Sequence, residues 1–441
     1  MSSSSHVIEH PWVDPWRVVS AYRHAPWMAF LDSGGAPTGE RARWSFLCVN
    51  PTETLMVQGG RILRNGQPAA GDAWTHLRDM QRHLRQMPQS TLPFTGGLVG
   101  LASYEAGMAL EGVASRHNAC TPILAAASYD NVLIFDRLEK RVFQTGDFPF
   151  SIDEMPVLPS APPIAFQPDM DRNAWIAAVR DIVRFIGAGD IFQANLTVRW
   201  HGDVPPCFDE FAAYGAIRQQ SPAPFGAYLR CGDGADFSLL SASVERFLSL
   251  SVEGQVETRP IKGTAPLGQS DEQRRKFSDF LQADIKENAE NLMITDLMRN
   301  DIGRVCDIGS VSVPQLCAVE QFTHVHHLVS CVQGQLKQGL DAIDLLRATL
   351  PPGSVTGAPK RRAMEIIDQV ERSARGAYCG SIFRIGRDGA MDSSVVIRSV
   401  ERNGSFLSIG AGGGITWPSD PQREHDEIQL KVAPLLGVFG Q

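Results

Sequence analysis

Two glutamate pairs with the same spacing stand in the C-terminal half of the sequence. Glu287 and Glu290 lie three residues apart in ADIKENAENLMITDLMRND, and Glu424 and Glu427 lie three apart in PQREHDEIQLK. Residues three apart share one face of a helix, where like charges repel by a few tenths of a kcal/mol unless a cation lies between them. Carboxylate oxygens are the ligands that Mg²⁺ prefers. Two such pairs on two helices are candidates for one shared Mg²⁺ site, and solvated helix faces are the alternative.

Two further segments are suited to an anionic ligand. Residues 351–360, PPGSVTGAPK, form a turn into a helix, with Thr356 as a possible N-cap, Pro359 in the first turn and Lys360 adding positive charge. An ordinary helix entry is the alternative. Residues 410–415, GAGGGI, follow the strand-like SFLSI, and their glycines let the backbone approach a ligand closely. A tight turn without a ligand is the alternative, and the spacing is not that of a dinucleotide site.

Three single residues carry chemistry of other kinds. Arg398, in the apolar strand pattern VVIRSV, needs a partner, which a substrate carboxylate or a neighbouring Asp or Glu would supply. Lys262, in TRPIKGTAP, is a nucleophile only when unprotonated, and most lysines are simply solvated. His327, in FTHVHHLVS, is a candidate for general acid–base work. In a strand, His324 and His326 would share one face and His327 the other.

The elements that must position these residues are mostly helices with clear apolar spacing. The predicted helices cover residues 171–190, about 272–300, 341–349, 359–373 and 420–436, and the predicted strands near the C-terminus cover 377–385, 391–402 and 405–410. Strands and turns dominate the first 150 residues. Strands and helices do not alternate strictly, so the pattern indicates an α/β (α+β) sandwich and not a doubly wound sheet.

A proline-rich stretch, residues 152–168, separates a strand-rich region at 1–151 from a region at 169–441 that carries all the candidate residues. No apolar run reaches the roughly 20 residues of a membrane span, and Met1–His10 has no apolar signal core. We therefore expect a cytoplasmic chain without membrane contact.

The formal net charge of −8 argues against a nucleic-acid partner, because such binding relies on clustered Lys and Arg. It does not exclude an anionic substrate, since a pocket can be basic inside an acidic protein. The eight cysteines are scattered without C-x-x-C spacing, so zinc and redox motifs are unsupported.

The segments together resemble the chorismate-utilising enzymes, a family that includes component I of anthranilate synthase, isochorismate synthase, salicylate synthase and component I of aminodeoxychorismate synthase. Its motifs occur here in the family's order: GDIFQANL, TRPIKGT, KENAENLMITDLMRND, FTHVHHLVS, PPGSVTGAPKRRAMEIID with YCGSI, and MDSSVVIRSV through GAGGGI to the final E-x-x-E-x-x-x-K. The resemblance implies the fold of anthranilate synthase component I. That fold is a two-layer β-sandwich with helices packed outside and an active site in the cleft between its halves.

The resemblance also implies roles for the candidate residues. Glu290 and Glu427 are similar to the family's direct Mg²⁺ ligands, and Glu287 and Glu424 to the pair acting through water. The implied chorismate-binding residues are Arg398 for one carboxylate, the backbone of Gly412 and Gly414 for the pyruvyl carboxylate, and Thr356, Tyr378 and Lys431 for further contacts. His327 is similar to the histidine placed near the departing 4-hydroxyl.

Lys262 points to one branch of the family. Most sister enzymes carry PIAGT or PLAGT here, whereas PIKGT resembles the aminodeoxychorismate synthases. There the lysine is thought to attack C2 of chorismate and to be displaced when ammonia adds at C4, on the way to p-aminobenzoate and folate. No glutaminase-like nucleophile segment is visible, so the resemblance implies that a separate glutamine amidotransferase subunit, component II, supplies the ammonia.

Two motifs depart from the family pattern. The S-P-E-R-F motif reads S-V-E-R-F at residues 243–247. The L-L-E-S segment of the tryptophan pocket in the anthranilate enzymes appears here only as Phe30-Leu31-Asp32-Ser33-Gly34. We therefore do not expect tryptophan to bind.

Overall fold

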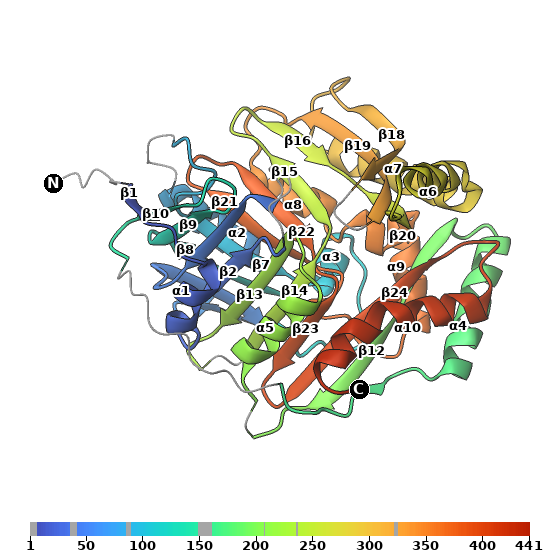
Figure 1. The fold of residues 1–441 in the computed structure, drawn as a ribbon, viewed down its shortest axis with the longest axis horizontal. Helices are drawn as coiled ribbons and strands as arrows, with labels where there is room; N and C mark the ends of the chain where they lie inside the picture. Colours follow the sequence, from blue (N-terminus) through green and yellow to red (C-terminus); the bar gives the residue numbers. More distant parts are fainter. Residues whose placement is uncertain are drawn as a thin grey trace.

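Two large antiparallel sheets form the centre of the protein in the computed structural model (Figure 1). The structure describes residues 7–35, 42–84, 90–148, 161–206, 208–234, 237–321 and 325–441, without the side chains of Thr264 and Val325. Within these ranges no helix is both long and apolar enough to cross a bilayer.

The first sheet, sheet A, contains strands from both ends of the chain. In spatial order its strands are β1 (Ile8–His10), β10 (Arg141–Thr145), β9 (Val132–Asp136), β3 (Trp44–Cys48), β2 (Ala29–Asp32), β13 (Phe225–Cys231), β14 (Phe237–Ser243), β23 (Ser399–Asn403), β24 (Phe406–Ile415), β12 (Gln193–Asp203) and β11 (Gln167–Pro168), with β20 (Gly357–Ala358) beside β12. The long pair β12–β24 brings the glycine-rich segment into this sheet, with Asn195 opposite Gly414 and Thr197 opposite Gly412.

The second sheet, sheet B, is built in the same way. Its order is β17 (Ile261–Pro266), β19 (Val325–Gln335), β16 (Gln255–Thr258), β15 (Arg246–Leu250), β22 (Met391–Val395), β21 (Ser381–Gly386), β7 (Gly97–Ala102), β8 (Leu124–Tyr129), β4 (Glu53–Gln58), β5 (Arg61–Arg64) and β6 (Gln67–Ala69), with β18 (Ser312–Gln321) beside β19. Lys262 and His327 lie on the neighbouring strands β17 and β19 at one end of this sheet.

The sheets face each other and the helices cover their outer faces. One core cluster joins Phe46 and Leu239 of sheet A to Val99 and Ala125 of sheet B. The helices are α1 (Pro15–Tyr22), α2 (Ala73–Leu84), α3 (Tyr104–Leu110), α4 (Arg172–Gly187), α5 (Glu210–Gln220), α6 (Asp271–Ala283), α7 (Ile285–Gly303), α8 (Ala342–Thr349), α9 (Lys360–Val370) and α10 (Pro421–Val438), with a 3-10 turn, η2, at Gly353–Val355. Helices α1, α4, α5, α9 and α10 pack on sheet A, and α2, α3, α7 and α8 on sheet B. The predicted α/β sandwich is thereby confirmed.

Three expected elements differ in detail. The predicted helix at 272–300 is two helices, because Asp284 is extended and caps the start of α7 by accepting a hydrogen bond from the Glu287 N–H. The predicted strand at 391–402 is two strands, β22 and β23. Residues 410–415 form no tight turn but continue β24, where the β12 backbone pairs with them.

Strands from both sides of the proline-rich stretch share both sheets. In sheet A, β2 pairs with β13, and in sheet B, β7 pairs with β21. The division at 152–168 stays a prediction, and most of that stretch lies outside the described residues. The candidate site residues all come from strands and helices that follow the proline-rich stretch. Strands that precede this stretch pair with later strands in both sheets.

Candidate active site

Helix α7 presents its carboxylates to the protein interior. Glu290 is buried and Glu287 half-buried, whereas Ile285 and Leu292 on the other side of the helix are exposed. Burial raises the pKa of Glu290, although the charges of Lys262 and Lys286 partly oppose that shift. Burial and the nearby Glu290 raise the pKa of Glu287. Helix α7 therefore directs Glu290 inward near its start, and further along it packs on sheet B through Ile294, Met298 and Ile302.

Helix α10 supplies the second pair. Asp420 caps its N-terminus by accepting hydrogen bonds from the backbone N–H groups of Gln422 and Arg423. Glu424, in the first turn, is buried, and Glu427, one turn later, is exposed. The Glu427 carboxylate lies 2.7 Å from the ammonium of Lys431. Burial acts to raise the pKa of Glu427, but the charge and hydrogen bond of Lys431 outweigh it, and the pKa is lowered.

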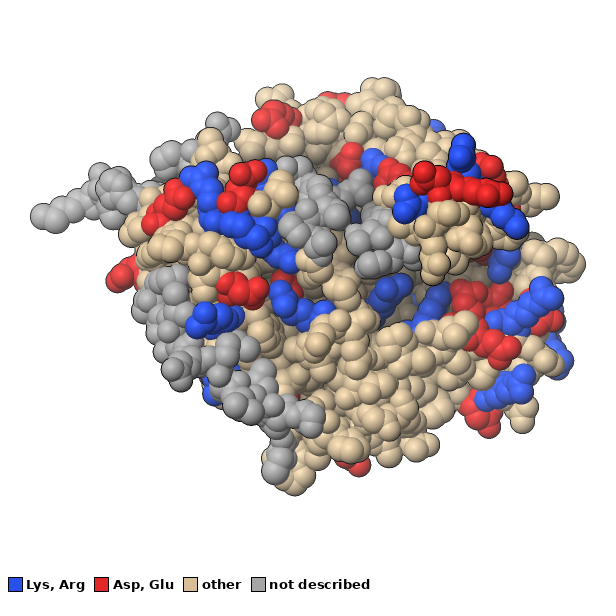
Figure 2. All heavy atoms as spheres, in the orientation of Figure 1, with Lys and Arg blue, Asp and Glu red and all other residues tan. Residues whose placement is uncertain are grey.

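One lysine joins the two helices. The Lys286 ammonium lies 3.1 Å from Oε1 of Glu424 and 3.9 Å from Oε1 of Glu290. Burial acts to lower the pKa of Lys286, but the charges of Glu424 and Glu290 outweigh it and raise that pKa. In Figure 2, basic and acidic side chains lie next to each other where Figure 1 draws β24 and α10.

The donor set on α7 and α10 suits a hard divalent cation. Four carboxylates come from two helices, and a positive group already lies between one carboxylate from each. In the described part of the chain, no three Asp, Glu, His or Cys side chains are gathered closely enough to hold a metal ion. By chemistry the four carboxylates still fit Mg²⁺, and in this structure lysines pair with Glu290, Glu424 and Glu427.

Lys262 connects sheet B to the glutamates. Its ammonium lies 3.9 Å from Oε2 of Glu290 and 3.4 Å from the Ser354 carbonyl oxygen of η2. Strand β17 changes register between Lys262 and Thr264, and Gly263 there has a φ of 70°, a conformation that favours glycine. A Cβ at Gly263 would lie 3.1 Å from Oε2 of Glu287, so the strand also approaches the other acid closely.

The glycine run of β24 faces both helices. A Cβ at Gly414 would lie 3.1 Å from Oε2 of Glu290, and one at Gly413 would lie 3.6 Å from Oε2 of Glu424. Lys431 donates a hydrogen bond of 3.0 Å to the Gly412 carbonyl. Beside Gly414, the buried Gln193 has a side-chain Oε1 without a partner among the described residues. Larger side chains on β24 would therefore fill the space that separates the strand from the acids.

Arg398 does not lie in a strand as predicted. It stands between β22 and β23 with a φ of 50°, exposed, and no carboxylate within the described ranges pairs with its side chain. Its surroundings still desolvate it enough to lower the guanidinium pKa. The sequence offered two partners for Arg398, and no neighbouring Asp or Glu pairs with it among the described residues. The remaining candidate partner is a carboxylate of a bound ligand.

His327 lies close to the Arg398 charge. Its Nδ1 is 3.4 Å from the Gly263 carbonyl oxygen. Burial lowers the pKa of His327, and the charge of Arg398 adds to that shift. The neutral imidazole is therefore favoured at neutral pH. His326 is buried on the neighbouring position of β19, and His324 lies outside the described residues.

Two expectations for residues 351–360 are wrong. Thr356 caps no helix: α9 begins at Lys360 after Pro359, and the Thr356 hydroxyl donates to the Gly353 carbonyl at 3.1 Å. Lys360 offers no charge to a ligand. Its ammonium is buried against Asp301 at 2.5 Å and also donates to two backbone carbonyls. A buried carboxylate on α7 competes for it more strongly than a surface anion can.

Thr356 and Tyr378 still border the site. The Thr356 carbonyl accepts a 2.6 Å hydrogen bond from the backbone N–H of Asn195, which lies opposite Gly414. The Tyr378 ring is buried against β24, where a Cβ at Gly410 would collide with it. Burial raises the Tyr378 pKa well above its usual value. Their contact with substrate stays a prediction.

Comparison with known proteins identifies the family to which the chain belongs. The model of the chorismate binding enzymes matches residues 30–437. The chain belongs to this family. It is 39% identical to aminodeoxychorismate synthase component 1 of Klebsiella aerogenes, over 96% of this chain and 97% of that one. It is 35% identical to anthranilate synthase component 1 of Thermus thermophilus, over 90% and 89%.

A solved member of the chorismate-binding family has the same fold. Anthranilate synthase component I from Streptococcus pneumoniae TIGR4 superposes with a TM-score of 0.78 at 28% identity, over 99% of this chain and 100% of that one. The expected family and its sandwich fold are both confirmed.

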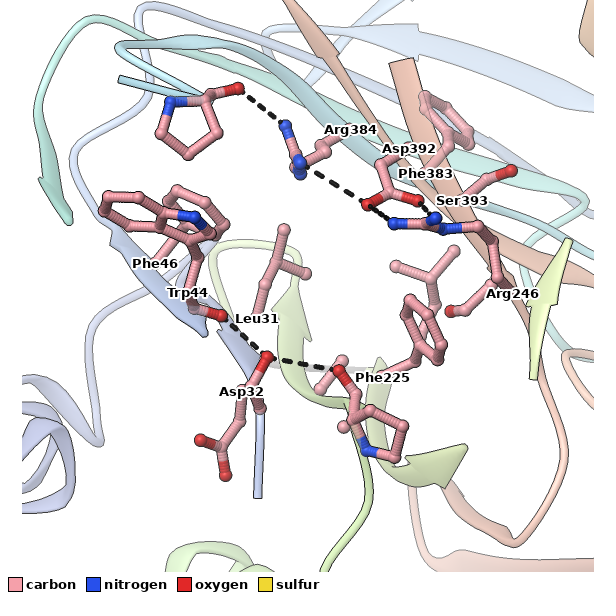
Figure 3. Close-up of a pocket in the computed structure, with 17 residues that line it drawn as sticks. Leu31, Asp32, Trp44, Phe46, Phe225, Arg246, Phe383, Arg384, Asp392 and Ser393 are labelled. Atoms are coloured by element: carbon pink, nitrogen blue, oxygen red, sulfur yellow. Dashed lines mark hydrogen bonds and ion pairs between the residues drawn. The ribbon is translucent and has the colours of Figure 1, made fainter. Parts of the chain in front are cut away.

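A cavity of about 270 Å³ in this chorismate-binding chain lies away from the predicted site residues, between the two sheets. Its wall carries the ion-paired chain Arg246–Asp392–Arg384. Figure 3 shows the Asp32 carboxylate turned away from the cavity, and its Oδ2 accepts a 2.5 Å hydrogen bond from Nε of Arg218. Asp32 therefore offers no free charge to a ligand here.

Two residues of the site escaped the sequence reasoning. Lys286 directly precedes Glu287 in the KENAEN motif, which was the available signal. Glu245, in the S-V-E-R-F segment, is buried within hydrogen-bonding reach of Ser354, and burial raises its pKa while the charge of Lys262 opposes the shift. The Lys262 charge also acts on Glu287, Glu290 and Glu427, so Glu245 is one of four carboxyl groups whose pKa it affects.

Proposed function

We propose that the chain is component I of aminodeoxychorismate synthase, which converts chorismate and ammonia into 4-amino-4-deoxychorismate for p-aminobenzoate and folate synthesis. The observation that carries the proposal is the place of Lys262. Its amine lies beside Glu290, within the site's glutamate cluster, on a strand whose sequence reads PIKGT. A nucleophile at this point is what distinguishes amination at C4 from amination at C2.

Binding of chorismate is divided between two sides of the site. Arg398, which lacks a carboxylate partner in the described structure, takes one substrate carboxylate by a two-pronged contact. The Gly412 and Gly414 backbone is the candidate contact of the pyruvyl carboxylate, because glycine has no side chain of its own to keep a ligand away. Glu287, Glu290, Glu424 and Glu427 would hold Mg²⁺, which would supply positive charge against a substrate carboxylate.

Catalysis by this chain needs an unprotonated lysine and a proton source. Glu245, which is buried within hydrogen-bonding reach of Ser354, is the candidate to take a proton from the Lys262 ammonium. The freed amine forms a bond to C2, the ring double bonds shift, and the C4–O bond breaks. The departing hydroxyl takes a proton from solvent and leaves as water, with the neutral imidazole of His327 as the candidate hydrogen-bond partner beside it. Ammonia then forms a bond to C4, the C2–N bond breaks, and the surplus proton passes to solvent. Lys262 regains its amine.

Ammonia comes from a glutamine amidotransferase subunit, component II. The relatives named component 1 imply such a second component. We recognised no glutaminase nucleophile segment in this sequence. Adding the amidotransferase and glutamine should therefore replace free ammonium in supporting turnover.

A second candidate is anthranilate synthase component I. The 35% identity to the Thermus enzyme is close to the identity of the aminodeoxychorismate relatives. In that reaction ammonia would attack C2 directly and no lysine nucleophile would be needed.

Product analysis separates the two candidates. The purified chain is incubated with chorismate, Mg²⁺ and ammonium at mildly alkaline pH, with and without aminodeoxychorismate lyase. p-Aminobenzoate formed only in the presence of the lyase supports the proposal. Fluorescent anthranilate formed without the lyase contradicts it and favours the second candidate.

A further inference from the structure

Lys286 is a cation of the protein's own at the place where the proposed metal ion would bind. We propose that its ammonium is a tethered counter-ion, which holds Glu290 and Glu424 together and has to withdraw when a divalent ion binds them. The inference rests on the metal site of the proposed function. It assigns to Lys286, the first residue of the KENAEN motif, a role that the glutamate spacing does not indicate.

The contacts of Lys286 define this role. Its Nζ lies 3.1 Å from Glu424 on α10 and 3.9 Å from Glu290 on α7, so one ammonium contacts one acid from each helix. Glu290 and Glu424 are only 6% and 4% exposed. Buried carboxylates are costly without a compensating charge. Among the described residues, Lys286 is the one cation within ion-pair distance of Glu424.

A divalent ion and the ammonium cannot share these oxygens. Mg²⁺ binds carboxylate oxygens at about 2.1 Å, so an ion bound to Glu290 would lie close to an ammonium that contacts the same carboxylate. Two cations so close repel strongly wherever water is partly excluded. Binding of the ion is therefore an exchange of one positive group for another.

The Lys286 side chain is free to make this exchange. It is 37% exposed and stands in the first turn of α7, on a flexible four-carbon stem. The other two lysines of the site are tied more closely to the backbone. Lys431 also donates to the Gly412 carbonyl and Lys262 to that of Ser354. Lys286 is bonded to carboxylates alone in the described contacts, so it is the lysine that a metal ion would displace.

The test compares Lys286→Met, which keeps the apolar stem and removes the charge, with Lys276→Met as a matched control. Lys276 is exposed on α6 and has no described partner. Each full-length protein is stripped with EDTA and titrated with Mg²⁺ in a calorimeter without chorismate, and its Tm is measured in EDTA and in Mg²⁺.

For Lys286→Met we expect the Kd for Mg²⁺ to fall roughly five- to tenfold, since a competing charge is gone. Its Tm in EDTA should fall by about 1–3 °C and return to the wild-type value in Mg²⁺. Lys286→Arg should restore both quantities, and the control should change neither. Unchanged or weaker Mg²⁺ binding by Lys286→Met, or an unchanged Tm in EDTA, would overturn the inference.

Failure of the proposed reaction would look different. Formation of anthranilate by the wild-type chain would contradict C4 amination and leave the cation exchange intact. A wild-type chain that binds no Mg²⁺ in the titration would overturn the exchange, while its products would still report on the reaction.

Discussion

The ammonium nitrogen of Lys262 lies 3.9 Å from Oε2 of Glu290. The two residues belong to different elements, β17 and α7, and the contact places the candidate nucleophile against the candidate metal ligands. A cation bound by Glu290 would weaken the hold of that carboxylate on the lysine. The nucleophile and the metal site are therefore electrostatically linked.

Replacing Lys262 tests the nucleophile. Lys262→Ala should lower aminodeoxychorismate formation by at least about a thousandfold, because the covalent route loses its attacking group. Lys262→Arg keeps a positive charge beside Glu290 but is no nucleophile, so it should be equally inactive. The lyase-coupled p-aminobenzoate assay measures both variants. Substantial activity of Lys262→Arg would assign the lysine a purely electrostatic role.

Replacing Arg398 tests the carboxylate contact. Arg398→Gln should raise the KM for chorismate about 10- to 100-fold, the value of a charge-assisted hydrogen-bonded pair, with a smaller effect on kcat. The folded protein should lose little stability, because the side chain has no described ion-pair partner to leave behind. Arg180→Gln, at an exposed position of α4, is the control. A KM equal to that of the control would remove Arg398 from the substrate site.

Replacing a glycine by alanine in the glycine run of β24 should reduce activity, whereas the same replacement at an open position should not. Gly414→Ala would place its Cβ 2.7 Å from Nε2 of Gln193 and 3.1 Å from Glu290, so it should reduce chorismate turnover. The overpacking should cost about 1–3 kcal/mol of stability. Gly437→Ala, on α10 with nothing within 4 Å of the added Cβ, is the matched control and should be as active as wild type. Steady-state kinetics and urea unfolding distinguish the two.

The buried Lys360–Asp301 pair predicts a loss of stability without a direct effect on substrate. Lys360→Ala should lower the free energy of unfolding by about 3–5 kcal/mol, because Asp301 remains buried with only Arg304 beside it. The double variant Lys360→Met with Asp301→Leu should recover much of that loss, since it removes both charges. Urea titration followed by circular dichroism reports both values. A loss below about 1 kcal/mol in the single variant would mean that solvent reaches Asp301.

A buried acid behind the site predicts a pH dependence of stability. Burial raises the pKa of Glu105, although its Oε1 accepts hydrogen bonds from the N–H groups of Arg375 and Gly376. A raised folded-state pKa means that the folded chain binds the extra proton. Its contribution to stability is therefore complete below the unfolded value of about 4.5 and is lost as pH rises through the folded pKa.

Glu105→Gln should abolish that dependence. Between pH 5 and 8 the wild-type free energy of unfolding should fall, by up to about 1.4 kcal/mol per pH unit from this residue, relative to the variant. The variant should be at least as stable as wild type at pH 8. Parallel pH profiles of the two proteins would show that Glu105 titrates normally.

Residue spacing predicted the acidic pairs and, within a few residues, helices α4, α8, α9 and α10, but it merged α6 and α7 into one helix. Glutamates three apart on α7 and α10 are a local feature, and local features survive folding unchanged. The positions that were wrong depend on distant partners. Lys360 is buried because Asp301 reaches it from another helix, and Arg398 leaves its strand where the chain passes from sheet B to sheet A.

Other features of the site had no local signal. Nothing in the run FSLLSASVERF indicates that the Lys262 charge acts on Glu245, since that effect depends on β15 and β17 lying in one sheet. The KENAEN motif draws attention to Lys286, but its ion pair with Glu424 depends on where α10 lies. Pairing between strands far apart in sequence is the information that periodicity does not contain.

The sharing of both sheets by early and late strands also has a consequence for how the chain folds. Strands near residues 30 and 100 pair with strands near residues 228 and 383. Such long loops must close before their contacts stabilise anything, so we infer slow folding with a late rate-limiting step. A nascent chain that has not yet made β13 and β21 exposes the edges of β2 and β7 to other chains. Chaperone protection during synthesis is therefore more important for this protein than its ordinary composition suggests.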